Sequence, residues 1–211
     1  MNSIPLKKYL SLKQSTSIKD IIGDTDIYLI DQIMKGRYKL NDTILDAGCG
    51  EGRNMYWFFK NNINIYGIDS NEETIRGLKN THPSLPEERL QISLIEKMPF
   101  RNNFFDHILS SAVLHFATTT MQFQNMITEM VRVLKPGGTL FIRMTSDIGI
   151  EDKVQVINNG VYSIPDGSVR FLLTRPLLAT LLQEKKLSFI EPLKTVNVDD
   201  VRCMSTLVLQ K

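Results

Sequence analysis

The hydrophobic positions of this chain form short apolar runs that alternate with segments of helical spacing. The runs predict strands over 43–47, 63–68, 90–95, 104–110 and 139–144. The other segments predict helices over 25–35, 54–61, 70–80 and 118–134. The helix over 70–80 begins with Ser70-Asn71-Glu72-Glu73, in which Ser70 and Glu73 match the two positions of a capping box.

After Ser146 the pattern is looser. The turn signal Asn158-Asn159-Gly160 predicts a hairpin with strands over 154–157 and 161–164, which we interpret as an insertion. The C-terminal pattern then predicts a helix over 175–185, which Thr174 caps. Two strands follow it, over 188–196 and 203–209. Outside the insertion, the predicted strands number seven.

The first strand runs directly into a loop with three alternating glycines, in the sequence Leu45-Asp46-Ala47-Gly48-Cys49-Gly50-Glu51-Gly52. Glycine has no Cβ, so Gly48, Gly50 and Gly52 can adopt positive φ and let a ligand lie against bare backbone. The helix that follows directs its free N–H groups at that ligand. A glycine-rich turn without a ligand is the alternative interpretation.

An acidic residue on the second strand favours the ligand. Asp69 ends the run 63–68 and lies twenty-one residues after Gly48, near the separation of about 20 residues at which an acidic residue meets ribose hydroxyls. The pair predicts a nucleoside site. It is not the dinucleotide fingerprint G-x-G-x-x-G, because Gly52 comes one residue early and Arg53 occupies the position of the last glycine.

The glycine loop and Asp69 together resemble the class I S-adenosylmethionine (SAM)-dependent methyltransferases, whose first motif is similar to 45–52. The segment Leu134-Lys135-Pro136-Gly137-Gly138-Thr139-Leu140 also resembles the turn before the fifth strand of these enzymes. The resemblance implies an α/β fold with a doubly wound, Rossmann-like, seven-stranded and mostly parallel sheet. The implied strand order is 3-2-1-4-5-7-6, with the last strand antiparallel and helices on both faces.

The same resemblance implies one methyltransferase domain over 1–211. Its expected parts are an N-terminal helical cap over 1–41 and a SAM-binding core over 42–146. An insertion or lid over 147–175 and a C-terminal helix with a hairpin over 176–211 follow.

SAM, with its product S-adenosylhomocysteine, is the implied cofactor. The backbone of 48–52 would lie against its methionyl part, Asp69 would bind the ribose hydroxyls, and Arg53 would bind the methionine carboxylate or remain a surface helix residue. Glu96 is the expected adenine contact, since it precedes the Pro-Phe step that follows the adenine wall in this family. The expected cofactor residues are Asp46, Gly48, Cys49, Gly50, Gly52, Arg53, Asp69, Ser70, Glu96 and Ser111.

A small-molecule acceptor is expected beside the methyl group. Base-amino methylases commonly carry Asp or Asn followed by Pro-Pro and an aromatic residue after the fourth strand, and Ser110-Ser111-Ala112-Val113 lacks that pattern. His115 is the candidate general base, or a histidine that only hydrogen-bonds a backbone carbonyl. Asp26 and Tyr28 are expected to contact the substrate from a lid, or else to cap a helix and pack at an interface.

Composition limits the remaining functions. A formal charge of +2 without a block of like charges does not favour nucleic acid. Two cysteines outside any CxxC pair suit a reducing compartment, no His, Asp or Glu spacing suggests a metal, and no apolar run approaches a membrane span of about 18 to 20 residues. We therefore expect a soluble, cytoplasmic protein, and the oligomeric state stays open.

Two other classes of function remain alternatives. A nicotinamide-dependent oxidoreductase accounts for the glycines and Asp69 but not for the other motifs. A non-catalytic SAM-binding partner protein accounts for the loop but gives no role to a substrate lid.

Overall fold

A mixed sheet with the strand order β10-β11-β5-β4-β1-β2-β3 forms the centre of the computed structural model, which describes residues 17–211. Its strands are β1 (Thr43–Ala47), β2 (Asn64–Asp69), β3 (Leu90–Ile92), β4 (Phe105–Ser111), β5 (Leu134–Ser146), β10 (Lys194–Val198) and β11 (Arg202–Gln210). Strands β1 to β5 pair in parallel, and β11 is antiparallel to both neighbours. With β10 and β11 as the sixth and seventh strands, the predicted order 3-2-1-4-5-7-6 is confirmed.

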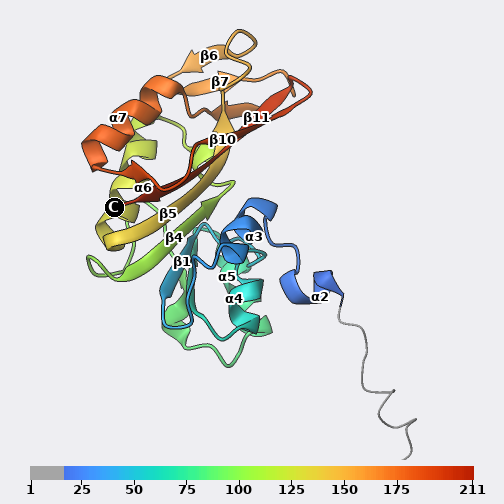
Figure 1. Cartoon of the computed structure of the whole chain (residues 1–211), viewed down its shortest axis with the longest axis vertical. Coiled ribbons are helices and arrows are strands. Elements are labelled where there is room, and N and C mark those ends of the chain that lie inside the picture. Colours follow the sequence, from blue (N-terminus) through green and yellow to red (C-terminus); the bar gives the residue numbers. More distant parts are fainter. Residues whose placement is uncertain (1–16) are drawn as a thin grey trace, which may run out of the picture.

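Helices cover both faces of this sheet because successive strand residues point to opposite sides. Ile44 and Leu109 pack in the cluster with α3, α4 and α5, whereas Leu45 and Ile108 pack in the cluster with α6 and α7. The two groups of helices lie on either side of the sheet in Figure 1. The helices are α2 (Ile18–Ile22), α3 (Ile27–Met34), α4 (Tyr56–Lys60), α5 (Glu72–Thr81), α6 (Thr120–Val133) and α7 (Arg175–Lys185), with 3-10 turns η1 (Glu87–Arg89) and η2 (Leu114–Phe116).

The predicted helix α5 begins one residue later than its capping box implied. Asn71 caps it, since the side chain of Asn71 accepts hydrogen bonds from the N–H groups of Glu73 and Thr74. The Asn71 N–H in turn donates to the Asp69 carboxylate, 2.9 Å away. Because this contact closes the end of β2 over Asp69, Ser70 stays outside the helix, and the Ser70 capping box was wrong.

Two predicted strands are shorter than their apolar runs. β3 ends at Ile92 because it is an edge strand, and Ile92 and Leu94 are exposed rather than buried in one face. The run 188–196 divides into β9 (Ser188–Phe189) and β10. Pro192 lies in the break and has no N–H to donate to a ladder, which explains the division.

The predicted insertion forms a separate three-stranded sheet. β6 (Gln155–Asn158) and β7 (Val161–Ser163) are the predicted hairpin, and β8 (Val169–Phe171) adds a third strand that the pattern did not predict. This sheet is joined to the end of β5 through a bridge between Ser146 and Leu173. It lies at the upper end of the molecule in Figure 1.

Candidate functional site

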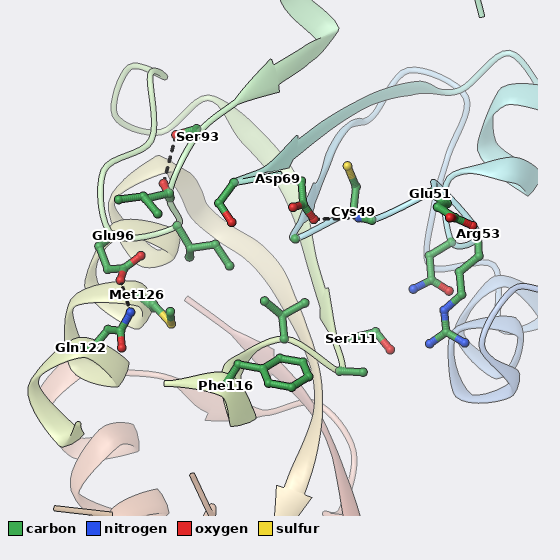
Figure 2. A pocket seen from close by; sticks show the side chains of 18 residues that line it. Cys49, Glu51, Arg53, Asp69, Ser93, Glu96, Ser111, Phe116, Gln122 and Met126 are labelled. Carbon is green, nitrogen blue, oxygen red and sulfur yellow. Dashed lines mark hydrogen bonds between the residues drawn. The ribbon is translucent and has the colours of Figure 1, made fainter. Parts of the chain in front are cut away.

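The carboxyl ends of β1, β2 and β4 open into a cavity of about 730 Å³. Strand order reverses between β1 and β4, which is the position at which open α/β sheets bind ligands. Its predicted lining residues are Gly48, Cys49, Gly50, Arg53, Asp69, Ser70, Glu96 and Ser111. Figure 2 shows Cys49, Asp69 and Ser111 around the hollow, with Glu96 at one end and Arg53 at the other.

A side chain is excluded at each of the three loop glycines for a different structural reason. All three have positive φ, but a Cβ on Gly48 would meet the Val113 side chain at 2.5 Å and one on Gly52 would meet Leu78 at 2.7 Å. A Cβ on Gly50 would meet nothing within 4 Å, so it would project into open cavity. Gly52 does not line the cavity, and its expected cofactor contact is replaced by packing against α5.

Asp69 connects the second strand to the glycine loop. Its Oδ2 accepts a hydrogen bond from the Gly50 N–H at 3.0 Å, and Oδ1 accepts one from Asn71. The carboxylate therefore fixes the loop and remains among the lining groups, where it can accept hydrogen bonds from a ligand.

Asp46 lies beneath the loop and does not line the cavity. It is almost fully buried, and its Oδ2 has no hydrogen-bond partner within the described part of the chain. Burial raises the pKa of this carboxyl to about 7; nearby Arg53 opposes that shift, while the charge of Asp69 adds to it. Because Asp46 does not line the cavity, the cofactor contact expected of it stays a prediction.

The opposite end of the cavity is mostly apolar. Leu94, Ile95 and Met126 line it beside Glu96, whose carboxylate accepts a hydrogen bond from Gln122 at 2.6 Å. Figure 2 shows this pair on the α6 side of the hollow. Apolar walls with one polar pair are suited to a flat heteroaromatic ring.

Asp26 and Tyr28 are not brought into the cavity. Asp26 is buried at the N-cap of α3, where Arg143 binds its carboxylate at 2.9 Å and Ser111 donates to it at 3.3 Å. The Arg143 guanidinium lies 4.9 Å from the centre of the Tyr28 ring. In this structure both residues attach α3 to β5, and Asp26 also lies 3.7 Å from Arg53, which lines the cavity. The substrate contact expected of the two residues stays a prediction.

His115 does not line this cavity either. It lines a smaller neighbouring cavity of about 220 Å³ between η2 and the β6-β7-β8 sheet. Its Nδ1 accepts a hydrogen bond from the Thr145 N–H at 3.3 Å, and burial lowers its pKa to about 4, with Arg170, Arg202 and Arg143 adding to the effect. Since Nδ1 is an acceptor, the neutral ring carries its proton on Nε2 and cannot accept a proton there. The structure thus places His115 in the smaller cavity, and its role as a general base stays a prediction.

Several lining residues were not predicted as site residues. They are Glu51, Asn54, Ser93, Leu94, Ile95, Ala112, Val113, Phe116, Gln122 and Met126. Gln122 and Met126 lie about one helical turn apart on α6, and the helical spacing over 118–134 predicted the helix but not which of its side chains would line the cavity. Ala112 has φ of +62°, which is rare for a residue with a Cβ, and no sequence signal marks it.

Two expected absences concern metals and membranes. Among residues 17–211, no group of three or more His, Cys, Asp or Glu side chains is arranged to hold a metal ion. The same part of the chain contains no helix that is both long and apolar enough to cross a membrane.

The family described as "Methyltransferase domain" matches residues 45–142, which span β1 to β5 and every strand end of the large cavity. We refer to these residues, 98 of the 211, as the methyltransferase domain because they match that family model. Proteins with this fold include SAM-dependent methyltransferases, and the matched residues contain most of the lining of the large cavity.

Curated relatives match the methyltransferase domain over part of their length. A tRNA (carboxymethyluridine(34)-5-O)-methyltransferase of Arabidopsis thaliana is 32% identical over 99 residues, which are 47% of this chain and 23% of the relative. An uncharacterised methyltransferase of Synechocystis is 30% identical over 95 residues, 45% of this chain and 43% of the relative. The aligned region thus covers less than half of either relative.

Solved structures share the fold of the methyltransferase domain. A SAM-dependent methyltransferase of Methanosarcina mazei has a TM-score of 0.66 at 20% identity and covers 85% of this chain and 96% of its own. The Burkholderia thailandensis 1,6-didemethyltoxoflavin-N1-methyltransferase, solved with its substrate and S-adenosylhomocysteine, has a TM-score of 0.68 at 15% identity over 97% of this chain and 86% of its own.

Proposed function

We propose that this chain binds SAM in the large cavity and transfers its methyl group to a small-molecule acceptor. The observation that carries the proposal is the pairing of Gly50 and Asp69, which places bare backbone and a carboxylate side by side at the switch point of the sheet. The non-catalytic SAM-binding protein remains the alternative, and the nicotinamide oxidoreductase ranks below it because Arg53 departs from the dinucleotide fingerprint.

The groups around the cavity suit the parts of SAM. Asp69 supplies acceptors for ribose hydroxyls, and the apolar walls around Leu94 and Met126 suit adenine. Gly50 leaves the space for the ligand that a Cβ would fill. We propose that Arg53, which is half-exposed at the end of the cavity away from Glu96, binds the methionine carboxylate of SAM.

SAM supplies a methyl group on a sulfonium: the acceptor's lone pair forms a bond to the methyl carbon while the carbon–sulfur bond breaks and its electrons go to sulfur. The chain's contribution is therefore positioning and exclusion of water rather than a covalent intermediate. Ser111, Ala112 and Phe116 lie at the β4 end of the cavity, and we propose that the acceptor approaches past them.

We also propose that the segments of one domain over 1–211 have different roles. Residues 42–146 would bind the cofactor, and the insertion over 147–175 would act as a lid over the acceptor. Asp26 supports a structural role for the N-terminal cap over 1–41, because its ion pair with Arg143 fastens α3 to β5. The part of the cap before residue 17 lies outside the described residues.

A transfer assay with three acceptor pools tests the proposal. Labelled methyl from SAM is followed into a small-metabolite extract, total tRNA and a protein extract, with SAM affinity measured on the same preparation. The proposal predicts labelling of the metabolite pool. Labelling of tRNA alone would show that the acceptor is a nucleic acid and not a small molecule. SAM binding without any transfer would favour the non-catalytic SAM-binding protein.

A further inference from the structure

The second cavity presents hydrogen-bond donors and positive charge to whatever occupies it. It lies between η2 and β8, and its polar lining includes His115 and Arg170, while Phe116 lines both this cavity and the large one. The two cavities are therefore neighbours that share one aromatic side chain.

His115 enters this cavity as a donor. The backbone N–H of Thr145 and its hydroxyl, at 3.3 and 3.1 Å, both lie on Nδ1. A backbone N–H can only donate, so Nδ1 accepts and the proton of the neutral ring is on Nε2. Within residues 17–211 the Nε2–H has no hydrogen-bond partner. His115 is 7% exposed, and Nε2 is not among the fully buried atoms without a partner, so it is accessible from outside the protein core.

Arg170 supplies positive charge and makes no ion pair within 4 Å among the described residues, although the Asp166 carboxyl is near enough to feel its charge. Its guanidinium lies 5.2 Å from the centre of the Phe116 ring and donates to the carbonyl of Val169. Arg202 and Arg143 each have a carboxylate within 4 Å, from Asp166 and Asp26, whereas Arg170 has none among the described residues. No carboxylate lines the cavity in that part of the chain.

From this juxtaposition we infer that the second cavity binds an oxyanion, a carboxylate or a phosphate, carried by the small-molecule acceptor. The Nε2–H of His115 and the guanidinium of Arg170 would hold the anion, and the reacting atom would extend past Phe116 toward Ala112. The inference rests on the proposed function and assigns its substrate class. A volume of about 220 Å³ suits a single charged group of a small molecule rather than a nucleic-acid backbone.

Nitrogen-15 NMR of the imidazole rings tests the inference without any methyl transfer. The chain has three histidines, so the His115 ring signals can be assigned by substitution. The protein, saturated with S-adenosylhomocysteine, is titrated with benzoate, with phenyl phosphate and with uncharged benzamide. We expect the Nε2–H tautomer, a saturable shift of His115 with at least one of the two anions, and no shift with benzamide.

Two variants make the test specific. Arg170→Gln should weaken anion binding about tenfold or more, because a charge-assisted hydrogen bond is lost. Arg76→Gln, which removes an exposed arginine of α5, should leave binding unchanged. Equal affinity in Arg170→Gln, equal shifts with benzamide, or an Nδ1–H tautomer would overturn the inference. A short RNA that displaces these signals when neither anion binds would overturn it in favour of a nucleic acid.

The two proposals fail separately in this design. SAM binding with no anion-dependent shift would refute the oxyanion site and leave the cofactor assignment standing. Saturable anion binding in a protein that binds no SAM would refute the proposed function and leave an oxyanion site that requires another reaction.

Discussion

At the scale of single residues, Gly50 and Asp46 are in the least favourable environments for an ordinary side chain. Gly50 has φ of +52° and faces open cavity, so its conformation and its missing side chain both serve a ligand. Asp46 is a buried acid whose Oδ2 has no hydrogen-bond partner among the described residues, which folding alone does not favour.

Gly50→Val should abolish SAM binding, because the new side chain fills the cavity and a β-branched residue is strained at φ of +52° in the loop. The rest of the fold should persist, since no neighbour is displaced. Gly77→Ala is the matched control, since Gly77 lies within α5 with nothing near its Cβ position and with ordinary helical φ. The control should stabilise the protein by up to about 1 kcal/mol and leave affinity unchanged. Calorimetry with circular dichroism checks both, and wild-type affinity in folded Gly50→Val would contradict the assignment.

Asp46 should make stability depend on pH. Its pKa is about 7 in the folded protein against an ordinary value of 3.8, so the folded state holds the proton more tightly. Stability contributed by this group is complete below about pH 4, falls as pH rises toward 7, and stays low above it. One pKa unit corresponds to about 1.4 kcal/mol, which limits the loss to about 4 kcal/mol.

Asp46→Asn cannot ionise and should flatten that part of the profile. Urea unfolding of both proteins at intervals between pH 4 and 8 measures the difference. Parallel profiles for wild type and variant would show that Asp46 is not the titrating group.

At the scale of elements, one carboxylate joins the N-terminal helix to the end of the sheet. Glu191 contacts Lys35, Arg37 and Lys194 at 2.8, 2.8 and 3.1 Å. Partial burial would raise the pKa of this carboxyl, but the hydrogen bonds from Lys35 and Lys194 lower it to about 2. The contact thus stabilises the fold above about pH 4.5 and weakens as pH falls toward 2.

Glu191→Gln should therefore lower the free energy of unfolding by about 1 to 3 kcal/mol at pH 7, since it leaves three cations without their shared partner. Glu184→Gln, an exposed position on α7, should change it by less than about 0.5 kcal/mol. Chemical denaturation of the two variants gives the comparison, and similar values for both would remove the stabilising role of Glu191.

Sequence patterns predicted the elements that depend on local residues. The proximity of Gly50 and Asp69 could be predicted from the sequence, because the carboxyl ends of parallel strands lie at the same edge of a sheet. The orientation of the His115 ring could not be predicted, because Thr145 of β5, thirty residues away, fixes it. Phe116 and Gln122 were also missed, since their approach to the cavity depends on how η2 and α6 pack.

At the scale of the whole molecule, ligand binding should raise thermal stability. S-adenosylhomocysteine at about 100 times its Kd should add about 2.7 kcal/mol, which corresponds to a rise in Tm of about 5 to 10 °C for a chain of this size. NAD at the same concentration should give no rise. A rise with NAD and none with S-adenosylhomocysteine would favour the oxidoreductase.

The central claim is that the cavity beside Asp69 is the SAM site, and calorimetric titration of S-adenosylhomocysteine into wild type and Asp69→Asn tests it most directly. Loss of a charged acceptor for the ribose hydroxyls should raise Kd at least about tenfold. Asp152→Asn, an exposed turn position, serves as the control and should bind like wild type. Equal Kd values for all three folded proteins, or no binding to the wild type, would contradict the claim.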